Sequence, residues 1–433
     1  MSSTENSSSQ SKTNQTAVFA ATNYRGEKRP FGIKQADRRS HLYLIGKTGT
    51  GKSTLLETFM RHDLQSGNGF TLLDPHGDLV ERIKEFIPEN RANDVIDFDV
   101  PDNRQPFGFN PLSGIPVSKR PLAASGMLSV FKHLWFDSWG PRLEHILRNS
   151  LLTLLDQTNA VLGDILRLLH DAKFRKEAVA KVENEEVKKF WLDEYNKYPE
   201  RLRAEAIAPL QNKVGAFITN PLLGRIFNRP EKPLQLRKIM DEGRILLVNL
   251  SKGKIGEDTA LLLGSLLISR LGLAALTRTD TPQEQRPDHY LYLDEFHSFT
   301  TLSLASMLSE LRKYRLNLIL AHQYLSQLDP AIRDAVLGNV GSIVAFRVGA
   351  ADAELLAPEF APEITATDLT NLPNYHIYLK MMINGAVSKP FSAITFNPDP
   401  SENADSLAEQ PSSQNQTSNL LPNKNYSIEP DSS

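Results

Sequence analysis

The chain has 433 residues, of which 40% are apolar and 23% are charged, and its formal net charge is −2. This composition predicts an ordinary globular protein with two or three folding units and a large core. The near-neutral charge excludes a global basic field, so any nucleic-acid-binding surface must be local. Because the sequence has no cysteine, it excludes disulfides, thiolate metal sites and a cysteine nucleophile.

Both ends of the sequence differ in composition from the middle. Residues 1–17 are rich in Ser, Thr, Asn and Gln, and residues 397–433 are rich in Pro, Ser, Asn and acidic side chains. Such segments bury too little apolar surface to fold alone, so we expect disordered tails. The N-terminus also lacks the basic and apolar regions of a signal peptide.

The most apolar segment runs from Ala260 to Leu276 and is interrupted by Arg270. It falls short of the roughly 18 uninterrupted apolar residues that a membrane-spanning helix needs. We therefore expect a helix buried on a sheet. The sequence predicts a cytoplasmic protein with no direct membrane insertion, a location that the absence of cysteine also suits.

Strands and helices alternate after a strand-like segment at 17–24. Apolar strands are expected at 41–45, 70–73 and 94–98, and helices at 52–65 and 78–87. This alternation is typical of parallel β-α-β units. We assign residues 18–121, which end in a loop containing Pro and Gly at 101–121, to the first part of an α/β core.

Residues 122–240 follow a helical pattern instead. Apolar side chains recur at helical spacing, and charged helical stretches such as 171–196 follow without a strong strand. We expect an all-α insertion domain whose charged faces are in solvent. The α/β pattern resumes over 241–396, the second part of the core, with strands at 245–250, 290–293, 316–321, 342–346 and 376–382 and helices at 257–277 and 302–313.

A complete phosphate-binding loop, G-x-x-x-x-G-K-S, separates the strand at 41–45 from the helix that follows it. Its glycines let backbone N–H groups surround phosphate oxygens, and the helix N-terminus adds a positive dipole. In this motif Lys52 reaches the β- and γ-phosphates and Ser53 ligates Mg²⁺. The motif thus predicts an α/β protein with a RecA-like P-loop NTPase core that binds ATP and Mg²⁺. The expected nucleotide-binding residues are Gly46, Lys47, Thr48, Gly49, Thr50, Gly51, Lys52, Ser53 and Thr54.

The apolar strand at 290–293 ends in Asp294 and Glu295, which is the Walker B pattern. We expect Asp294 to hold Mg²⁺ through its water shell and Glu295 to polarise the attacking water, because phosphoryl transfer depends on positioning and charge stabilisation. An apolar strand that ends in acids is common by itself. After a phosphate loop, the pair indicates hydrolysis rather than nucleotide binding alone.

The strand at 316–321 is followed by His322 and Gln323. In an additional-strand P-loop ATPase this strand lies between the two Walker strands, and Gln323 would face the γ-phosphate as a sensor. Taken alone, a glutamine at a strand end more often caps a loop.

Two arginines, Arg312 and Arg315, precede that strand at the end of a helix. Cations near a helix C-terminus are favourable for structural reasons alone. The functional alternative is an arginine finger that stabilises transition-state charge in a neighbouring subunit. We prefer Arg312 for that role and leave both interpretations open.

Three further features are weaker. The segment 74–77, Asp-Pro-His-Gly, places a carboxylate near the phosphates or starts the next helix. Lys252 and Lys254 lie in an expected flexible loop and are candidate contacts to a DNA backbone. Trp135 and Trp139 bracket a loop of the insertion, where core packing is a better explanation than base stacking. The histidines have no metal-ligand spacing, so Mg²⁺ is the only metal expected.

Together these motifs resemble the HerA/FtsK superfamily of DNA-pumping ATPases, and within it the conjugative coupling proteins of the TraD/TraG type and their soluble relatives. The order of the parts is more specific than the Walker motifs alone. The segments that carry the resemblance are GKTGTGKST (46–54), LLDPHGDL (72–79), FGFNPL (107–112), WGPRLEHILRN (139–149), LYLDEFHSF (291–299), LRKYRLNLILAHQ (311–323) and GNVGSIVAFRVG (338–349).

The resemblance implies a ring, usually a hexamer, with ATP sites between subunits and DNA in the central channel. It assigns ATPase roles to Lys52, Ser53, Asp294, Glu295 and Gln323. It also aligns Arg312 with the arginine before the Gln-ended strand and offers Arg142 of the insertion as a second arginine. Membrane-bound coupling proteins carry N-terminal transmembrane helices that this sequence lacks, which puts a direct membrane role in doubt.

The sequence therefore predicts an ATP-hydrolysing DNA translocase of conjugative or type IV secretion DNA transfer, with relaxase or secretion components as partners. A HerA-like helicase that serves a nuclease in DNA end processing is an alternative. A secretion ATPase that moves protein is another, and a non-catalytic nucleotide-gated scaffold is a third, against which Glu295 argues.

Overall fold

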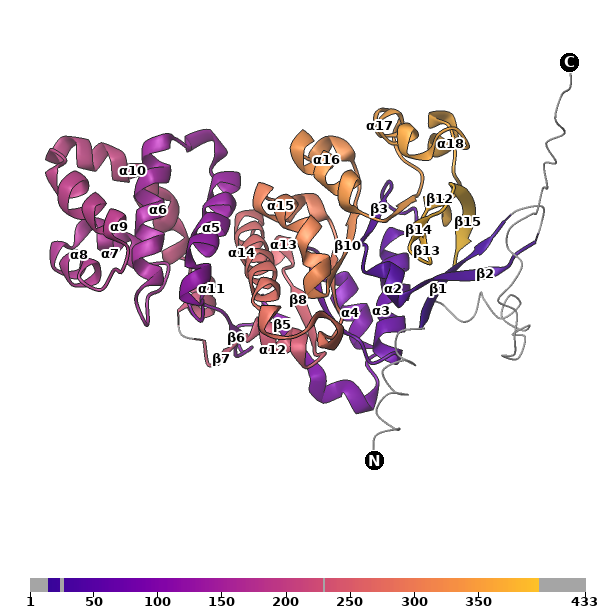
Figure 1. Ribbon diagram of the computed structural model, residues 1–433, viewed down its shortest axis with the longest axis horizontal. Coiled ribbons are helices and arrows are strands. Elements are labelled where there is room, and N and C mark those ends of the chain that lie inside the picture. The colour runs from indigo at the N-terminus through magenta and orange to yellow at the C-terminus, as the bar shows by residue number, and fades with distance from the viewer. Residues whose placement is uncertain (1–14, 24–26, 229, 397–433) are drawn as a thin grey trace, which may run out of the picture. The chain divides into compact units, whose positions relative to one another are not determined.

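The computed structural model describes residues 15–23, 27–228 and 230–396, which belong to the first of the two units of the chain. An eleven-stranded sheet, in the order β2-β1-β15-β12-β11-β3-β10-β9-β4-β8-β5, organises this unit (Figure 1). Residues 1–14 of the tail expected at 1–17, and the tail expected at 397–433, lie outside the described residues. The strands are β1 (Thr16–Thr22), β2 (Pro30–Lys34), β3 (Leu42–Ile45), β4 (Gly69–Asp74), β5 (Val95–Asp99), β8 (Ile245–Asn249), β9 (His289–Leu293), β10 (Leu316–His322), β11 (Ser342–Ala345), β12 (His376–Lys380) and β15 (Phe391–Thr395).

The sheet is mostly parallel, as expected for a RecA-like core. Strands from β11 through β3, β10, β9, β4 and β8 to β5 all run in one direction. The strands β12, β15, β1 and β2 extend it in antiparallel pairing. Strand β10 lies between β3 and β9, so the Gln-ended strand separates the two Walker strands as predicted.

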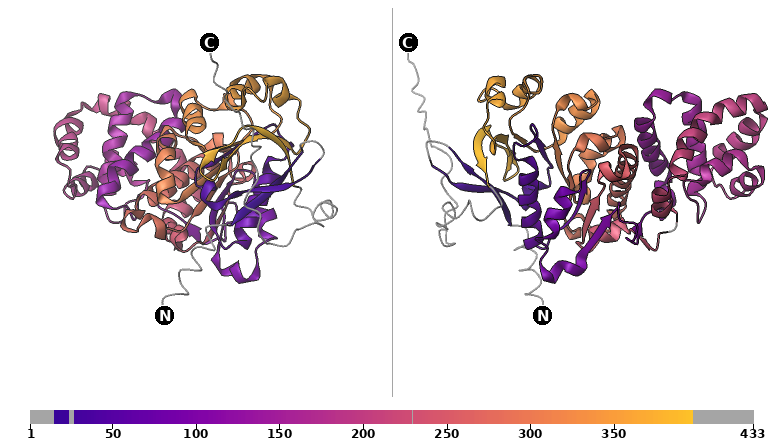
Figure 2. Two further views of the ribbon diagram at one scale, coloured as in Figure 1. Left: turned by 45° about the vertical axis from the view of Figure 1, so that its right-hand side comes forward. Right: turned by 180° about the vertical axis from the view of Figure 1, so that it is seen from behind.

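Helices cover both faces of the sheet, because alternate side chains of each parallel strand enter different apolar clusters. On β3, Leu42 and Leu44 pack with α3 and α4, whereas Tyr43 and Ile45 belong to the cluster that contains α14 and α15 (Figure 2). A strand buried on both faces has apolar side chains at nearly every position, which explains why these strands were recognisable as apolar runs in the sequence. The core helices are α2 (Gln35–Arg38), α3 (Lys52–Gln65), α4 (Asp78–Lys84), α12 (Leu236–Asp241), α13 (Lys252–Ile255), α14 (Glu257–Leu276), α15 (Leu302–Leu311), α16 (Pro330–Asn339), α17 (Ala350–Phe360) and α18 (Ala366–Thr370).

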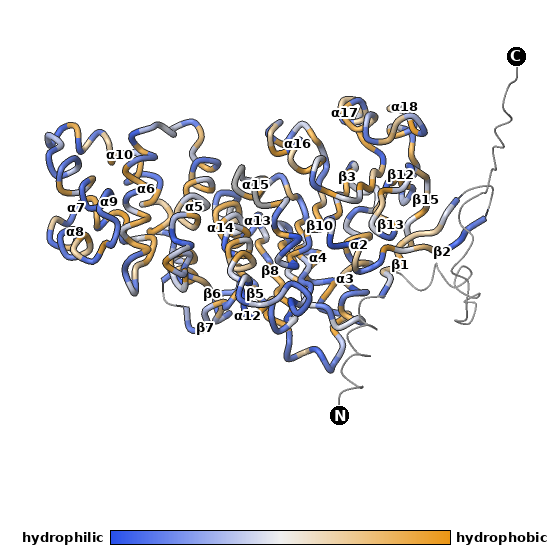
Figure 3. The backbone as a smooth tube through the Cα atoms, viewed as in Figure 1, coloured by the Kyte–Doolittle hydropathy of each residue, from blue (hydrophilic) through white to orange (hydrophobic). Residues whose placement is uncertain are grey.

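Helix α14 is apolar almost all round, and most of its trace has the hydrophobic colours in Figure 3. The segment Glu257–Asp280 is long and apolar enough to cross a membrane, but 78% of its most apolar window is buried inside the protein. A core helix of a soluble protein has the same properties, and α14 packs against α5, α12 and α15. This agrees with the expected helix buried on a sheet.

The insertion consists of helices whose apolar side chains form one continuous cluster with the core. Its first helix, α5, packs along α14. Two short strands, β6 (Phe107–Gly108) and β7 (Lys232–Pro233), pair in parallel and join the segments that lead into and out of it. The helices are α5 (Arg120–Leu134), α6 (Pro141–Leu155), α7 (Asp164–His170), α8 (Ala172–Val179), α9 (Glu185–Lys189), α10 (Glu200–Ile218) and α11 (Pro221–Phe227).

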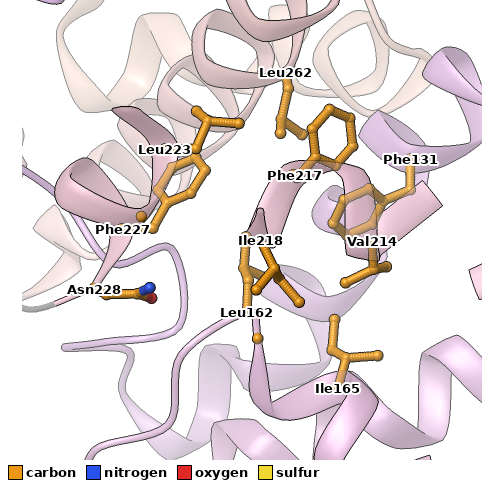
Figure 4. Close-up of a pocket in the computed structure, with 12 residues that line it drawn as sticks. Phe131, Leu162, Ile165, Val214, Phe217, Ile218, Leu223, Phe227, Asn228 and Leu262 are labelled. Carbon is orange, nitrogen blue, oxygen red and sulfur yellow. The ribbon is translucent and has the colours of Figure 1, made fainter. Parts of the chain in front are cut away.

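The pocket in Figure 4 lies where the insertion meets α14. Apolar side chains such as Phe131, Phe217 and Leu262 line it, and Asn228 is the polar side chain that the view labels. Its volume is about 30 Å³, far below the roughly 300 Å³ of a small ligand pocket. We interpret it as a packing gap between two layers of side chains.

The structure differs from the expected element boundaries at several places. Strand β1 begins at Thr16, inside the expected tail, because Thr16 pairs with Lys34 of β2. The range 122–240 contains the strand β7 as well as α12, which packs on β4 and α14 of the core. The stretch 171–196 is divided into short helices, since Asp171 and Asn184 cap new helix starts.

Candidate functional site

The carboxyl ends of the parallel strands bring the predicted site residues to one edge of the sheet. Ile45 of β3 lies opposite His322 of β10, so the phosphate loop and Gln323 leave the sheet side by side. Leu293 of β9 lies opposite both Leu73 of β4 and Leu320 of β10, which places the Walker B acids between the same neighbours. Ligands of open α/β sheets bind at this edge.

The phosphate loop is held by its own backbone and by glycine. Gly51 has φ 118°, and a Cβ there would lie 2.9 Å from the Tyr375 ring, so this position excludes side chains. The hydroxyl of Thr50 donates to the carbonyl of Lys47 at 2.7 Å. Nζ of Lys52 donates to the carbonyls of Gly46 at 2.5 Å and Lys47 at 3.1 Å, which keeps the ammonium group at the loop.

The two Walker B acids form a buried anionic centre beside Lys52. Asp294 is 8% exposed and Glu295 is 7% exposed. Burial, together with the charges of Glu295 and Asp74, raises the pKa of Asp294 to about 7. Burial lowers the pKa of Lys52, while Glu295 and Asp294 oppose that shift. The neighbouring charges of Glu295 and Asp74 favour binding of a cation, because a positive charge would stabilise the ionised form of Asp294.

A chain of side-chain hydrogen bonds links the phosphate loop to Glu295 through Gln323. The hydroxyl of Thr48 donates to Oε1 of Gln323 at 2.8 Å, and Nε2 of Gln323 donates to Oε1 of Glu295. Glu295 has φ 48° and ψ 48°, which is a left-handed backbone conformation. This conformation costs free energy for a residue other than glycine, and residues that adopt it are concentrated at functional sites. Gln323 therefore connects the phosphate-binding loop to the Walker B acid Glu295.

The Asp74 carboxylate has both of the roles considered for it, since it starts the next helix and also lies close enough to the site to affect its charge. Its oxygens accept hydrogen bonds from the backbone N–H groups of His76, Leu79 and Val80, so it fixes the start of α4. Its charge also contributes to the raised pKa of Asp294. The residue is thus a structural cap whose charge acts on the site.

Arg312 and Arg315 lie away from this edge, because both precede β10, and Gln323 follows the other end of that strand. Arg312 is exposed and begins a 3₁₀ turn at the amino end of β10. The strand between it and Gln323 has seven residues and spans roughly 23 Å. Arg315 is buried, and its Nη1 lies 3.8 Å from Asp288 Oδ1. This ion pair indicates a structural role. Arg142 is exposed in the first turn of α6.

Lys252 and Lys254 are in the short helix α13 rather than in the flexible loop expected from the sequence. The reason is hydrogen bonding to the segment after β4, because the hydroxyl of Ser251 donates to the carbonyl of His76 at 3.0 Å and Lys252 N–H donates to the carbonyl of Pro75 at 2.8 Å. The loops that follow β8 and β4 are therefore joined.

Sequence reasoning missed His297. Its Nδ1 lies 3.4 Å from Oε2 of Glu295. Burial lowers the pKa of His297, Glu295 raises it, and the charge of Lys252 lowers it. The imidazole thus lies beside the Walker B acid, and the charge of Lys252 on α13 acts on it. The sequence feature that could have indicated this contact is the position of His297, two residues after Glu295. Trp135, by contrast, is buried and stacked on Phe131, as core packing predicted.

The residues present fit a nucleoside triphosphate and its metal ion. The loop and the start of α3 present backbone N–H groups, and Lys52 supplies a positive charge. Asp294 supplies the carboxylate oxygen that Mg²⁺ prefers, and a divalent cation would relieve the repulsion that raises its pKa. The fold and the site together define a RecA-like P-loop ATPase.

Comparison with known proteins narrows this class. The model of the family described as "Helicase HerA, central domain" matches residues 29–271, more than half of the chain, and the chain belongs to that family. No curated protein matches it at a significant level.

Among solved structures, the plasmid coupling protein TrwB in complex with the non-hydrolysable ATP analogue ADPNP has a TM-score of 0.62 and 17% sequence identity over 90% of each chain. TrwB in complex with ADP and Mg²⁺ has a TM-score of 0.60 and 17% identity over 91% of this chain and 94% of its own. VirB4 of Thermoanaerobacter pseudethanolicus has a TM-score of 0.59 and 13% identity over 90% of this chain and 98% of its own. At these identities the likeness establishes the fold.

Proposed function

We propose that the chain is an ATP-hydrolysing DNA translocase that works as a hexameric ring in conjugative or type IV secretion DNA transfer. The observation that carries the proposal is the convergence of Lys52, Asp294, Glu295 and Gln323 at one edge of a HerA-type core. TrwB, a plasmid coupling protein, has this fold and binds an ATP analogue and ADP with Mg²⁺.

In this proposal residues 46–54 hold the phosphates of ATP, with Lys52 at the β- and γ-phosphates. Ser53 and Asp294 hold Mg²⁺, which supplies charge neutralisation of the phosphates when it is bound. Glu295 accepts the proton of the attacking water. The hydrogen bond from Gln323 orients one oxygen of Glu295, and Thr48 joins Gln323 to the loop. Turnover then depends on groups that are fixed before the reaction begins.

The arginine that completes the site comes from a neighbouring subunit. Since roughly 23 Å of strand separates Arg312 from its own Gln323, its side chain does not reach its own phosphate loop. Exposure at the opposite edge of the sheet leaves Arg312 available to a neighbour in a ring. The finger would supply positive charge as the γ-phosphoryl group leaves.

The DNA contact lies at α13. Lys252 and Lys254 bind DNA phosphates, and a few such cations lining a channel are sufficient for a near-neutral chain. The charge of Lys252 acts on His297, and His297 lies beside Glu295. DNA phosphates bound at α13 would therefore change the electrostatic environment of His297 and, through it, of Glu295.

Two other functions remain as alternatives. A HerA-like helicase with a nuclease partner has the same motor, and the family model favours it. A secretion ATPase that moves protein is favoured by the likeness to VirB4. Relaxase or secretion components are the expected partners of a conjugative motor, and we propose a cytoplasmic location with no direct membrane insertion.

The test is ATP hydrolysis by full-length protein with and without single- and double-stranded DNA, on material sized by light scattering. Hydrolysis that DNA stimulates in hexamers supports the proposal. Hydrolysis that no DNA changes supports the protein-moving alternative, and no hydrolysis in hexamers contradicts the catalytic assignment.

A further inference from the structure

Tyr375 is an exposed aromatic side chain at the phosphate loop. Its side chain is 40% exposed, although one ring edge packs on Gly51. A Cβ at Gly51 would lie 2.9 Å from Cδ1 and 3.4 Å from Cε1 of Tyr375. Cδ1 and Cε1 are thus the ring atoms next to Gly51, and Tyr375 keeps 40% of its surface accessible. An accessible aromatic residue therefore lies directly beside the residues that would hold phosphates.

The backbone of Tyr375 is fixed to the loop and to the sheet. Its N–H donates to the carbonyl of Thr50 at 2.9 Å, and its carbonyl accepts from the N–H of Thr395 at 2.9 Å and the hydroxyl of Thr395 at 3.1 Å. Its φ is 65°, in the left-handed region that a tyrosine seldom adopts. Such a conformation persists only where the surroundings determine it, and it is concentrated at ligand sites.

The segment before Tyr375 is tied to the same loop by Arg347, the residue after Phe346 at the end of β11. The Arg347 guanidinium donates to the carbonyl of Leu372 at 3.1 Å and to Oδ1 of Asn374 at 3.0 Å. The Arg347 carbonyl accepts from the N–H of Lys47 at 2.8 Å. The backbone that carries the ring is therefore held by contacts on both sides of Tyr375, and it is joined to the phosphate loop.

We propose that the Tyr375 ring is the stacking platform for the nucleobase of ATP. Stacking on an aromatic side chain requires only the π-face of the base, so the contribution comes from ring area rather than from the tyrosine hydroxyl. The proposal rests on nucleotide binding at the phosphate loop and adds recognition of the base, which no phosphate contact provides. The ligand class is a nucleoside triphosphate, in preference to the bare polyphosphate.

Equilibrium binding of two ligands separates the base from the phosphates. Calorimetry with ATP and with inorganic tripolyphosphate, both with Mg²⁺, would be compared for the full chain, Tyr375→Phe and Tyr375→Leu. We expect Tyr375→Leu to weaken ATP binding about tenfold and to leave tripolyphosphate binding unchanged. Tyr375→Phe should bind both ligands as the natural chain does. Phe136→Leu, at a remote exposed aromatic, is the matched control and should change neither.

Two results would overturn the proposal. One is Tyr375→Leu protein that binds ATP with natural affinity, and the other is an equal loss of affinity for both ligands. Tripolyphosphate binding by the natural chain shows separately that the phosphate loop works, so failure of the base platform is distinguishable from failure of the nucleotide site. If Tyr375→Leu does not fold, photolabelling of the natural chain with 8-azido-ATP decides: label on the peptide containing Tyr375 supports the proposal, and label elsewhere contradicts it.

Discussion

Gln323 donates a hydrogen bond from Nε2 to Oε1 of Glu295, across two neighbouring parallel strands. The same Gln323 accepts from the hydroxyl of Thr48 in the phosphate loop at 2.8 Å. A change at the γ-phosphate that moves Gln323 would therefore also move the Glu295 carboxylate, which we propose activates water. Binding at the phosphate loop and the position of Glu295 are therefore coupled through Gln323.

The first prediction separates binding from hydrolysis. Lys52→Ala should weaken ATP binding, because the loop loses its point charge. Glu295→Gln should bind ATP normally but hydrolyse it about 10²-fold more slowly or worse, since an amide does not accept the proton. Calorimetry and a phosphate-release assay measure the two quantities. Near-natural hydrolysis by Glu295→Gln would remove the Walker B assignment.

The second prediction concerns the position of Glu295. Gln323→Ala should keep ATP affinity and lower kcat by about 10-fold to 100-fold, because the carboxylate loses the donor that orients it. Gln327→Ala, at an exposed glutamine four residues later, is the matched control and should keep natural turnover. If Gln323→Ala hydrolyses ATP as fast as this control, Gln323 only joins two loops.

The third prediction is a pH dependence that belongs to Asp294. Its pKa, raised to about 7, means that the folded protein retains a proton that the unfolded chain releases between about pH 4 and 7. The stability that this group contributes without metal should fall as pH rises through that window. Mg²⁺ requires the carboxylate, so MgADP should raise the unfolding temperature more at pH 8 than at pH 6.

Thermal unfolding of the natural chain and of Asp294→Asn, each with ADP plus either Mg²⁺ or EDTA, measures this effect. The Asn variant lacks the titrating group, so its Mg²⁺-dependent shift should be small at both pH values. An equally large Mg²⁺ effect in the variant would place the metal on other ligands.

The fourth prediction tests whether Arg312 acts between subunits. Arg312→Ala should retain ATP affinity and lose up to about 10³-fold in turnover, the scale of an arginine finger. Mixing Arg312→Ala with Lys52→Ala should partly restore hydrolysis, because some interfaces then have an intact loop and an intact finger. If subunits exchange and mixing restores nothing, Arg312 has another role, and Arg142 becomes the candidate.

The fifth prediction concerns DNA. Replacing Lys252 and Lys254 with alanine should reduce the dependence of log K on log salt by about two units, roughly one for each lost phosphate contact. The matched control is the pair Lys188 and Lys189 of the insertion, a half-buried and an exposed cation that pair with nearby glutamates. If only the control pair lowers the slope, DNA binds the insertion instead of α13.

Much of the fold and part of the site were predictable from the sequence. The buried α14 and the placement of Lys52 and Asp294 at one edge follow from local patterns and the rules of parallel sheets. The position of β10 between the Walker strands was expected from the strand order of additional-strand P-loop ATPases, because no local pattern determines strand order. The contact between Gln323 and Glu295 depends on the register of β9 and β10. Local patterns show where each strand ends but do not determine how the two strands are aligned.

Other features depend on tertiary hydrogen bonds between segments far apart in sequence. Tyr375 reaches Gly51 only because Thr50 and Thr395 fix a left-handed backbone, and no pattern around Tyr375 indicates that. The helix at α13 likewise follows from the bonds that join it to Pro75 and His76. Patterns within a short window do not contain these contacts.

The central claim is that ATP hydrolysis at this site moves the protein along DNA. Displacement of a third strand from a DNA triplex, followed over time with purified hexamers, tests it most directly. The account predicts displacement that requires ATP and Mg²⁺ and that Glu295→Gln abolishes although it still binds ATP and DNA. Natural protein that hydrolyses ATP in the presence of DNA and yet displaces no strand, on either duplex or single-stranded flanks, would contradict it.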